Sequence, residues 1–341
     1  MKHRPELDGL RGIAILIVLA AHAHVPGFGS GGGGAGVTLF FGLSGYLITS
    51  LLLAEHSRAG RVDLRAFYIR RALRLFPALW AVLLGVLVLV LAGLMPQDKA
   101  LLGTDYRVVF LGVLAYVGNW VFVAGSSLGV LGHTWSLAVE EQFYLVWPAL
   151  LLIGLRVGQR RFATWVLVVA MLVTPWRLIL ASAGAVDQVL VGTDSHADAL
   201  LLGGVVALLG IRMPQIGGWI GIAGLCALAW IWPAPAGAGV VFLPVAAALS
   251  TMSVAGCPRL LAWGPLAFIG KISYGIYLYH GVIIWWGLAW PVTIVVSIGI
   301  SWVSYVLLES RFLKLKGRLR QAQPLAPSLS SQPALTEPGA G

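Results

Sequence analysis

Long apolar segments recur along the chain from its beginning to near its end. One bilayer crossing needs about 20 predominantly apolar residues in a helix, because the hydrocarbon core is about 30 Å thick. Segments of suitable length begin near Gly12, Val37, Pro77, Ala138, Ala163, Ala199, Gly217, Gly239, Pro265 and Pro291. They predict an all-α fold, a polytopic membrane helix bundle of about ten transmembrane helices.

The scarcity of charge agrees with this fold. Only 11% of the 341 residues are charged and 59% are hydrophobic, whereas a soluble domain carries about 25% charged residues. This composition excludes a soluble globular enzyme and a disordered chain, and it argues against a nucleic-acid partner despite the net charge of +10. Cys226 and Cys257 lack metal-ligand spacing, so we expect free thiols and no metal site.

The basic residues orient the chain, because Lys and Arg concentrate in the cytoplasmic loops of membrane proteins. If all the basic loops are cytoplasmic, the chain crosses about ten times and both termini lie inside. An eleventh apolar segment, 108–124, would turn the later basic loops outward if it crossed. We therefore expect it to be a short or re-entrant helix on the outer side, although its sequence leaves a full crossing open.

The chain divides into two predicted parts. Residues 1–312 form one transmembrane domain. Residues 313–341 are rich in Pro, Ser and Gln, a composition typical of disorder, and we expect a disordered cytoplasmic tail.

Arg11 and His22 are ionisable residues in the first apolar segment. Their separation of eleven residues is about three helical turns, so both lie on one face, roughly 16 Å apart. This places Arg11 at the cytoplasmic surface and His22 about halfway through the bilayer. An imidazole titrates near neutral pH, which suits a general base for a hydroxyl. The alternative is a neutral histidine that a neighbouring helix satisfies.

Arg70, Arg71 and Arg74 lie within one stretch, FYIRRALR. If this stretch is helical, spacings of three and four residues bring the guanidinium groups together. Guanidinium donors match phosphate oxygens. The alternative is positive-inside charge that contacts lipid headgroups.

The stretch HTWSLAVEEQFYLVWP, residues 133–148, brings two adjacent carboxylates to the start of a long apolar helix. We expect either Glu140 or Glu141 to lie in the first helical turn, favoured by the helix dipole, and the other to take up a cation or a proton inside the bundle. Tyr144 lies one turn after Glu140 and adds a hydroxyl to its face. A purely structural buried acid is the alternative.

Other polar residues give weaker signals. Asp194 and Asp198 fall at the outer mouth and the start of the sixth apolar segment, and His280 ends the aromatic run ISYGIYLYH. Ser44 and Gly45 lie inside an apolar segment, where small residues usually serve helix packing.

Five stretches together resemble the acyltransferase-3 family of integral membrane acyltransferases. They are PELDGLRGIA with His22, FFGLSGYLI, FYIRRALR, HTWSLAVEEQFY and ISYGIYLYH, they occur in the family's order, and they fall between residues 4 and 312. The resemblance implies transfer of an acyl group, often acetyl, from cytoplasmic acyl-CoA to a hydroxyl of a sugar, polysaccharide, macrolide or lipid. No tightly bound cofactor is implied.

The resemblance also implies roles for residues. Arg11 and His22 match the family's Arg-x10-His pattern, with His22 the expected catalytic residue, and Arg71 and Arg74 match its Arg-x-x-Arg pattern for acyl-CoA. His196 departs from the family, since many members have Arg in that stretch. The catalytic set expected is His22, Glu140 and Glu141; the acyl-CoA set is Arg11, Arg70, Arg71 and Arg74; the acceptor-side set is His133, Asp194, Asp198 and His280.

We therefore expect a multi-pass enzyme of the bacterial plasma membrane in which the acyl-CoA phosphates dock near the arginines and the thioester reaches His22. His22 then deprotonates the acceptor hydroxyl or briefly carries the acyl group, and sequence does not separate these routes. A polytopic transporter or flippase is the alternative, because ionisable residues inside spans also suit a substrate pathway. The chain shows no repeat between its halves, a feature of many transporters.

Overall fold

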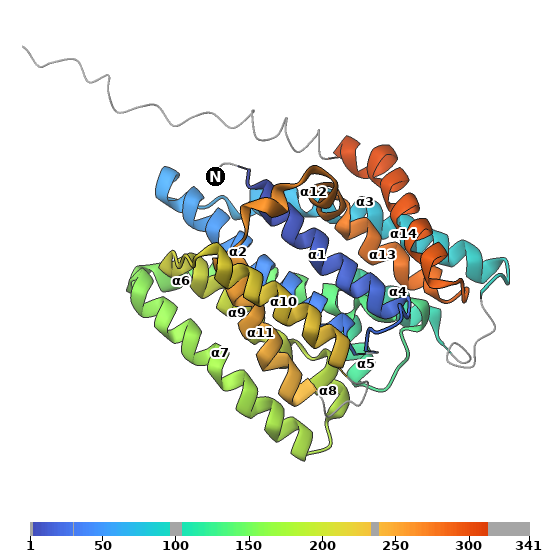
Figure 1. The fold of residues 1–341 in the computed structure, drawn as a ribbon, viewed down its shortest axis with the longest axis horizontal. Coiled ribbons are helices and arrows are strands. Elements are labelled where there is room, and N and C mark those ends of the chain that lie inside the picture. The colour runs from blue at the N-terminus through green and yellow to red at the C-terminus, as the bar shows by residue number, and fades with distance from the viewer. Residues whose placement is uncertain (1–2, 30, 96–103, 233–238, 313–341) are drawn as a thin grey trace, which may run out of the picture.

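The computed structural model describes residues 3–29, 31–95, 104–232 and 239–312, and these residues form helices without strands, packed into one bundle (Figure 1). The predicted all-α fold is confirmed for them, and the tail predicted at 313–341 lies outside the described residues. The elements are α1 (Pro5–His22), α2 (Gly33–Ala59), α3 (Leu64–Leu91), α4 (Tyr106–Leu114), α5 (Gly118–Val123), η2 (Gly129–Thr134), α6 (Trp135–Val157), α7 (Gln159–Ser182), α8 (Val186–Val191), α9 (Thr193–Leu209), α10 (Gln215–Ile231), α11 (Gly239–Ala255), η4 (Arg259–Ala262), α12 (Gly264–Lys271), α13 (Ser273–Ile284), α14 (Trp290–Ser304) and η5 (Tyr305–Glu309).

Six helical stretches are long and apolar enough to cross a membrane: Gly33–Ala59, Leu64–Leu91, Gly129–Val157, Gln159–Ser182, Val186–Leu209 and Trp290–Phe312. The pair α12 and α13, bent by 67°, would be a seventh, and α10 and α11 are apolar helices of 17 residues each. Helix α1 has 18 residues and includes Glu6, Asp8 and Arg11. These ten units coincide with the ten predicted segments, but only six or seven qualify by length and composition. The count of about ten and the location of the termini stay predictions.

Segment 108–124 folds as two short helices, α4 of nine residues and α5 of six. Tyr116, between them, has a positive φ of 53°, which breaks the helix. At 1.5 Å per residue neither helix approaches the 30 Å of a bilayer core. The prediction of a short helix is confirmed, and its placement on the outer side stays a prediction.

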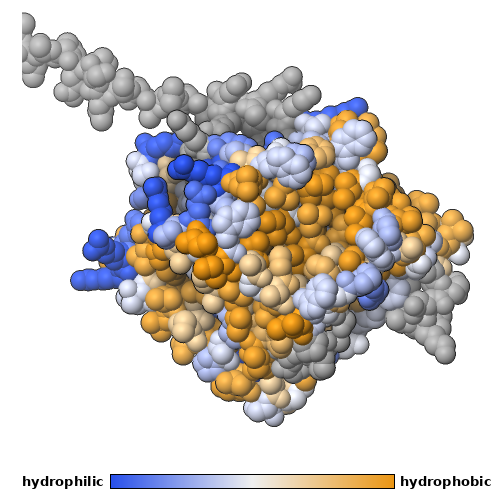
Figure 2. All heavy atoms as spheres, viewed as in Figure 1, coloured by the Kyte–Doolittle hydropathy of each residue, from blue (hydrophilic) through white to orange (hydrophobic). Residues whose placement is uncertain are grey.

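Apolar side chains cover much of the outer surface of the bundle, and hydrophilic ones gather along one edge (Figure 2). Leu84, Met171 and Val295, on three different helices, are each more than 60% exposed. Apolar patches of this extent are rare on the water-facing surface of soluble proteins, so this surface fits contact with lipid.

Helix α1 lies inside the bundle and packs against α2, α12 and α13. Leu10, Ala14 and Val18 are fully buried on it. Gly12 has no room for a Cβ, because the backbone of Leu266 in α12 lies against it. The helix that carries Arg11 and His22 is thus held rigidly in the interior.

Helices α2 and α9 also approach each other through glycine. A Cβ at Gly45 would collide with the carbonyl oxygen of Leu200, and one at Gly203 with that of Gly42. This close approach is typical of small residues in membrane helices and confirms that Gly45 serves packing.

Candidate active site

Three histidines from three helical elements meet at the end of α1. His22 Nδ1 lies 3.4 Å from Nε2 of His280 on α13, and the two ring centroids are 5.2 Å apart. The ring of His133, in η2, lies 4.9 Å from that of His280. We predicted His133 and His280 for the acceptor side of the site; the structure places them in the surroundings of His22.

Backbone carbonyls contact all three rings, that of Val18 lying near the His22 ring. His280 is fully buried, and its Nδ1 donates to the carbonyl of Tyr277 at 2.7 Å, with that of Ile276 at 3.1 Å. His133 Nε2 lies 3.2 Å from the Leu278 carbonyl. Any side chain at Gly281 would overlap the His133 ring, so this glycine lets η2 approach α13. In the part of the chain that the structure describes, no group of three or more His, Cys, Asp or Glu side chains is placed to hold a metal ion.

Glu140 accepts hydrogen bonds from two hydroxyls. The Tyr144 hydroxyl donates to Oε1 at 2.5 Å, as the spacing of four residues predicted, and the Ser44 hydroxyl of α2 donates to the same oxygen. Arg71 Nη2 is 3.8 Å from that oxygen. Glu140 thereby joins α2, α3 and α6 at one point.

Glu141 forms an ion pair with Arg71 of α3. Arg71 donates from Nε at 2.9 and 3.0 Å and from Nη2 at 2.5 Å, and its guanidinium lies 3.1 Å from the centre of the Tyr144 ring. The prediction that one of the two glutamates takes up a cation or a proton is confirmed for a cation. The prediction that one lies in the first helical turn is wrong, because α6 begins at Trp135 and the two acids fall in its second turn.

The arginines of α3 have different partners. The stretch is helical, since α3 begins at Leu64 after its N-cap Asp63. Arg70 pairs with Glu55 at 3.4 Å, whereas Arg71 pairs with Glu141. The third, Arg74, has no ion pair within the described residues.

Arg11, like Arg74, has no ion pair within the described residues. Its Nε is buried and has no hydrogen-bond partner among the described residues, and the ring of Phe40 lies 6.0 Å from its guanidinium. Arg11 and Arg74 are close enough to interact electrostatically. Two neighbouring guanidiniums that form no ion pair within the described residues can attract an anion, although Glu140 lies near them.

A small pocket lies beside Arg11. Tyr277 donates to the His133 carbonyl at 2.5 Å and lies 2.6 Å from Ser136 Oγ, so the pocket wall is hydrogen-bonded to the histidine region. The lining residues are Arg11, Val37, Phe40, Phe41, Ser136, Leu137, Glu140, Ser273, Tyr274 and Tyr277.

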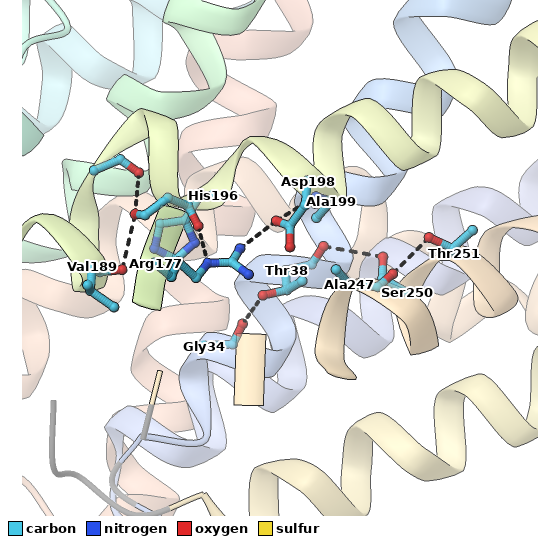
Figure 3. A network of polar contacts seen from close by, with 12 residues as sticks. Gly34, Thr38, Arg177, Val189, His196, Asp198, Ala199, Ala247, Ser250 and Thr251 are labelled. Carbon is cyan, nitrogen blue, oxygen red and sulfur yellow. Dashed lines mark hydrogen bonds and ion pairs between the residues drawn. The ribbon is translucent and has the colours of Figure 1, made fainter. Parts of the chain in front are cut away.

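Asp198 belongs to a second polar network (Figure 3). Arg177 of α7, which is fully buried, donates to Asp198 Oδ1 and to the Ser195 carbonyl, both at 2.6 Å. His196 Nε2 lies 2.8 Å from the Leu190 carbonyl. Asp194 accepts from Trp176 and Gln188, each at 2.7 Å. Within the described residues these contacts join α7, α8 and α9 and do not reach His22.

Sequence reasoning missed two partners. Ser44, which we predicted to serve packing, also donates to Glu140. Arg177, which pairs with Asp198, went unnoticed, although a lone arginine within the apolar stretch TPWRLIL requires an acid partner.

Comparison with known proteins bears on this site. The model of the acyltransferase-3 family, described as an acyltransferase domain, matches residues 4–308. The chain belongs to this family. The matched range includes the histidine cluster, both glutamates and the four arginines expected for acyl-CoA, Arg11, Arg70, Arg71 and Arg74.

Named relatives of the chain are longer proteins. It is 32% identical over 317 residues to the peptidoglycan O-acetyltransferase OatA of Listeria monocytogenes, covering 83% of the chain and 50% of the relative. It is 31% identical over 318 residues to the O-acetyltransferase OatA of Staphylococcus aureus, covering 83% and 51%. The chain thus spans about half the length of these relatives. No solved structure matches it.

Proposed function

We propose that this acyltransferase-3 protein moves an acyl group, acetyl by analogy with its relatives, from cytoplasmic acyl-CoA to a hydroxyl of a carbohydrate or glycoconjugate. One observation carries the proposal: a single helix, α1, bears both Arg11, which neighbours Arg74 of α3, and His22 of the histidine cluster. Arg11 and His22 are about 16 Å apart along α1, and Arg11 also lines a pocket.

The donor phosphates bind Arg11 and Arg74 in this proposal. Arg70 and Arg71, which we expected to share this role, already pair with Glu55 and Glu141. An acidic partner neutralises a guanidinium, so these two position α3 rather than bind phosphate. The acyl-pantetheine arm then enters the pocket along Phe40 and Ser136.

His22 acts as general base or acyl carrier. As base, it takes the proton of the acceptor hydroxyl while that oxygen attacks the thioester carbonyl carbon. The carbon–sulfur bond breaks, the CoA thiolate leaves and takes a proton, and an ester remains. As carrier, His22 attacks the same carbon first, and the acceptor oxygen then displaces it.

The two glutamates have different roles. Glu140 lines the pocket near Arg11 and orients the groups around the thioester. Glu141 holds Arg71 and acts as a positioning residue. Asp194 and Asp198 shape the outer ends of α7 to α9, where we place the acceptor.

The acceptor is a polysaccharide of the cell envelope, and the protein resides in the bacterial plasma membrane. Similarity to the Listeria relative, a peptidoglycan O-acetyltransferase, supports peptidoglycan as the first acceptor to test. A glycolipid or a macrolide presents the same chemical group, a hydroxyl.

Purified protein in proteoliposomes tests this function. Given radiolabelled acetyl-CoA and peptidoglycan fragments, it should form labelled ester that mild alkali releases. A transporter or flippase would move substrate across the bilayer and form no ester, and that result would contradict the proposal.

A further inference from the structure

We infer that His280 is a positioning residue that holds His22 in one tautomer, with the proton on Nδ1 and a bare Nε2. The inference rests on the proposed function, which makes His22 the reacting group. It adds which nitrogen reacts and which residue selects it.

The contacts of His280 determine which of its ring nitrogens carries the proton. Its Nδ1 contacts two backbone carbonyls, those of Tyr277 at 2.7 Å and Ile276 at 3.1 Å. A carbonyl oxygen can only accept a hydrogen bond, so Nδ1 must carry a proton. A neutral imidazole has one N–H, and Nε2 of His280 is then a bare acceptor.

A doubly protonated His280 does not fit this environment. The side chain is fully buried, and no carboxylate among the described residues pairs with it. A buried charge without a partner costs several kcal/mol. His280 is therefore neutral.

The hydrogen bond to His280 determines which nitrogen of His22 carries the proton. Its Nδ1 is the atom that faces the bare Nε2 of His280, at 3.4 Å. Two bare nitrogens would repel, so His22 Nδ1 supplies the proton of this hydrogen bond. The lone pair of neutral His22 then lies on Nε2, the other side of the ring.

Both chemical routes need this bare nitrogen. In direct transfer Nε2 accepts the proton of the acceptor hydroxyl, and in the carrier route its lone pair attacks the thioester carbonyl carbon. In each case His22 becomes positively charged, and its Nδ1–H bond to His280 strengthens. The inference therefore holds whichever route operates.

Substitution of His280 separates positioning from packing. His280→Leu removes the acceptor, and His280→Gln keeps an acceptor oxygen at a similar distance from the backbone. We expect His280→Leu to lower kcat about 10- to 100-fold, as loss of an orienting partner typically does, with KM for acetyl-CoA within about twofold. His280→Gln should recover most of kcat. The matched control is His24→Asn, since His24 is exposed and its φ of 56° suits asparagine.

The tautomer has a direct readout that needs no activity. Nitrogen-15 NMR of histidine-labelled protein distinguishes a protonated ring nitrogen from a bare one, and His22→Ala identifies the His22 signals by their loss. We expect Nδ1 protonated and Nε2 bare in the wild type, and a mixture of tautomers in His280→Leu.

Three results would overturn the inference: a protonated Nε2 on wild-type His22, a His280→Leu variant with wild-type kcat, or a His280→Gln variant as slow as His280→Leu. The proposed function fails in a different way. If wild-type protein shows the expected tautomer yet transfers no acetyl group from acetyl-CoA, the tautomer assignment stands and the enzymatic proposal is wrong.

Discussion

At the scale of single residues, the arginines differ by whether an acid already neutralises them. Arg71 is bonded through two nitrogens to Glu141, and Arg70 is paired with Glu55. Arg11 and Arg74 have no ion pair within the described ranges. A motif that matches Arg71 and Arg74 equally therefore contains one arginine with an acidic partner and one without an ion pair among the described residues, and we propose that the second binds phosphate.

The assignment of Arg74 predicts its effect on donor binding. Arg74→Ala removes a charge-assisted hydrogen bond to phosphate worth about 1.5–3 kcal/mol, so KM for acetyl-CoA should rise about 10- to 100-fold. Arg70→Ala, the control on the same helix, should change KM less than about twofold. Steady-state kinetics at fixed acceptor measures both, and equal effects would contradict the distinction.

The Arg71–Glu141 pair predicts a stability effect. Glu141→Gln leaves the Arg71 charge without its main partner among partly buried groups, where breaking a pair costs up to roughly 3–5 kcal/mol. Glu55→Gln breaks a longer contact and should cost less than about 1 kcal/mol. Thermal unfolding in detergent compares the two variants. A smaller loss for Glu141→Gln than for Glu55→Gln would show that Arg71 does not depend on Glu141.

At the scale of helices, glycine decides how closely the elements approach. Gly45 of α2 faces the backbone of α9. A Cβ added at Gly85 of α3, in contrast, would meet no atom of the described residues within 4 Å. The same substitution should therefore have opposite effects at the two positions.

Gly45→Ala should destabilise the protein by about 1–3 kcal/mol, because overpacking forces α2 and α9 apart. Gly85→Ala should stabilise it by about 0.5–1 kcal/mol, because alanine is the better helix former. Unfolding temperatures of both variants in one detergent test this, and a stable Gly45→Ala would contradict the tight α2–α9 contact.

The helical repeat explains which contacts could be predicted from the sequence and which could not. Spacing along one helix placed Arg11 with His22 and Tyr144 with Glu140, because a helix repeats every 3.6 residues. Contacts between helices, such as His22 with His280 or Arg177 with Asp198, depend on how elements far apart in sequence pack. Glu140 and Glu141 fall in the second turn because the helix continues upstream to Trp135, after Thr134, which makes no side-chain cap hydrogen bond.

At the scale of the whole molecule, the arrangement requires a defined orientation. In the proposed function the arginines face the cytoplasm, which supplies acyl-CoA, and the loop after α5 faces outward. Ser57, near the end of α2, and Ser126, after α5, are both exposed and lie on the two predicted sides.

Single cysteines at these positions test the orientation, after Cys226 and Cys257 are replaced by serine. A membrane-impermeant maleimide should label Ser126→Cys in intact cells and Ser57→Cys only after permeabilisation. The reverse pattern would contradict the cytoplasmic termini predicted from the basic loops.

The central claim is that His22 carries the acyl transfer, and its most direct test is the rate of acetyl-ester formation by His22→Ala in proteoliposomes. Loss of a general base lowers a rate about 10²- to 10⁴-fold, and we predict a loss in this range with His24→Asn unchanged. A His22→Ala variant that transfers the acetyl group at the wild-type rate would contradict the account.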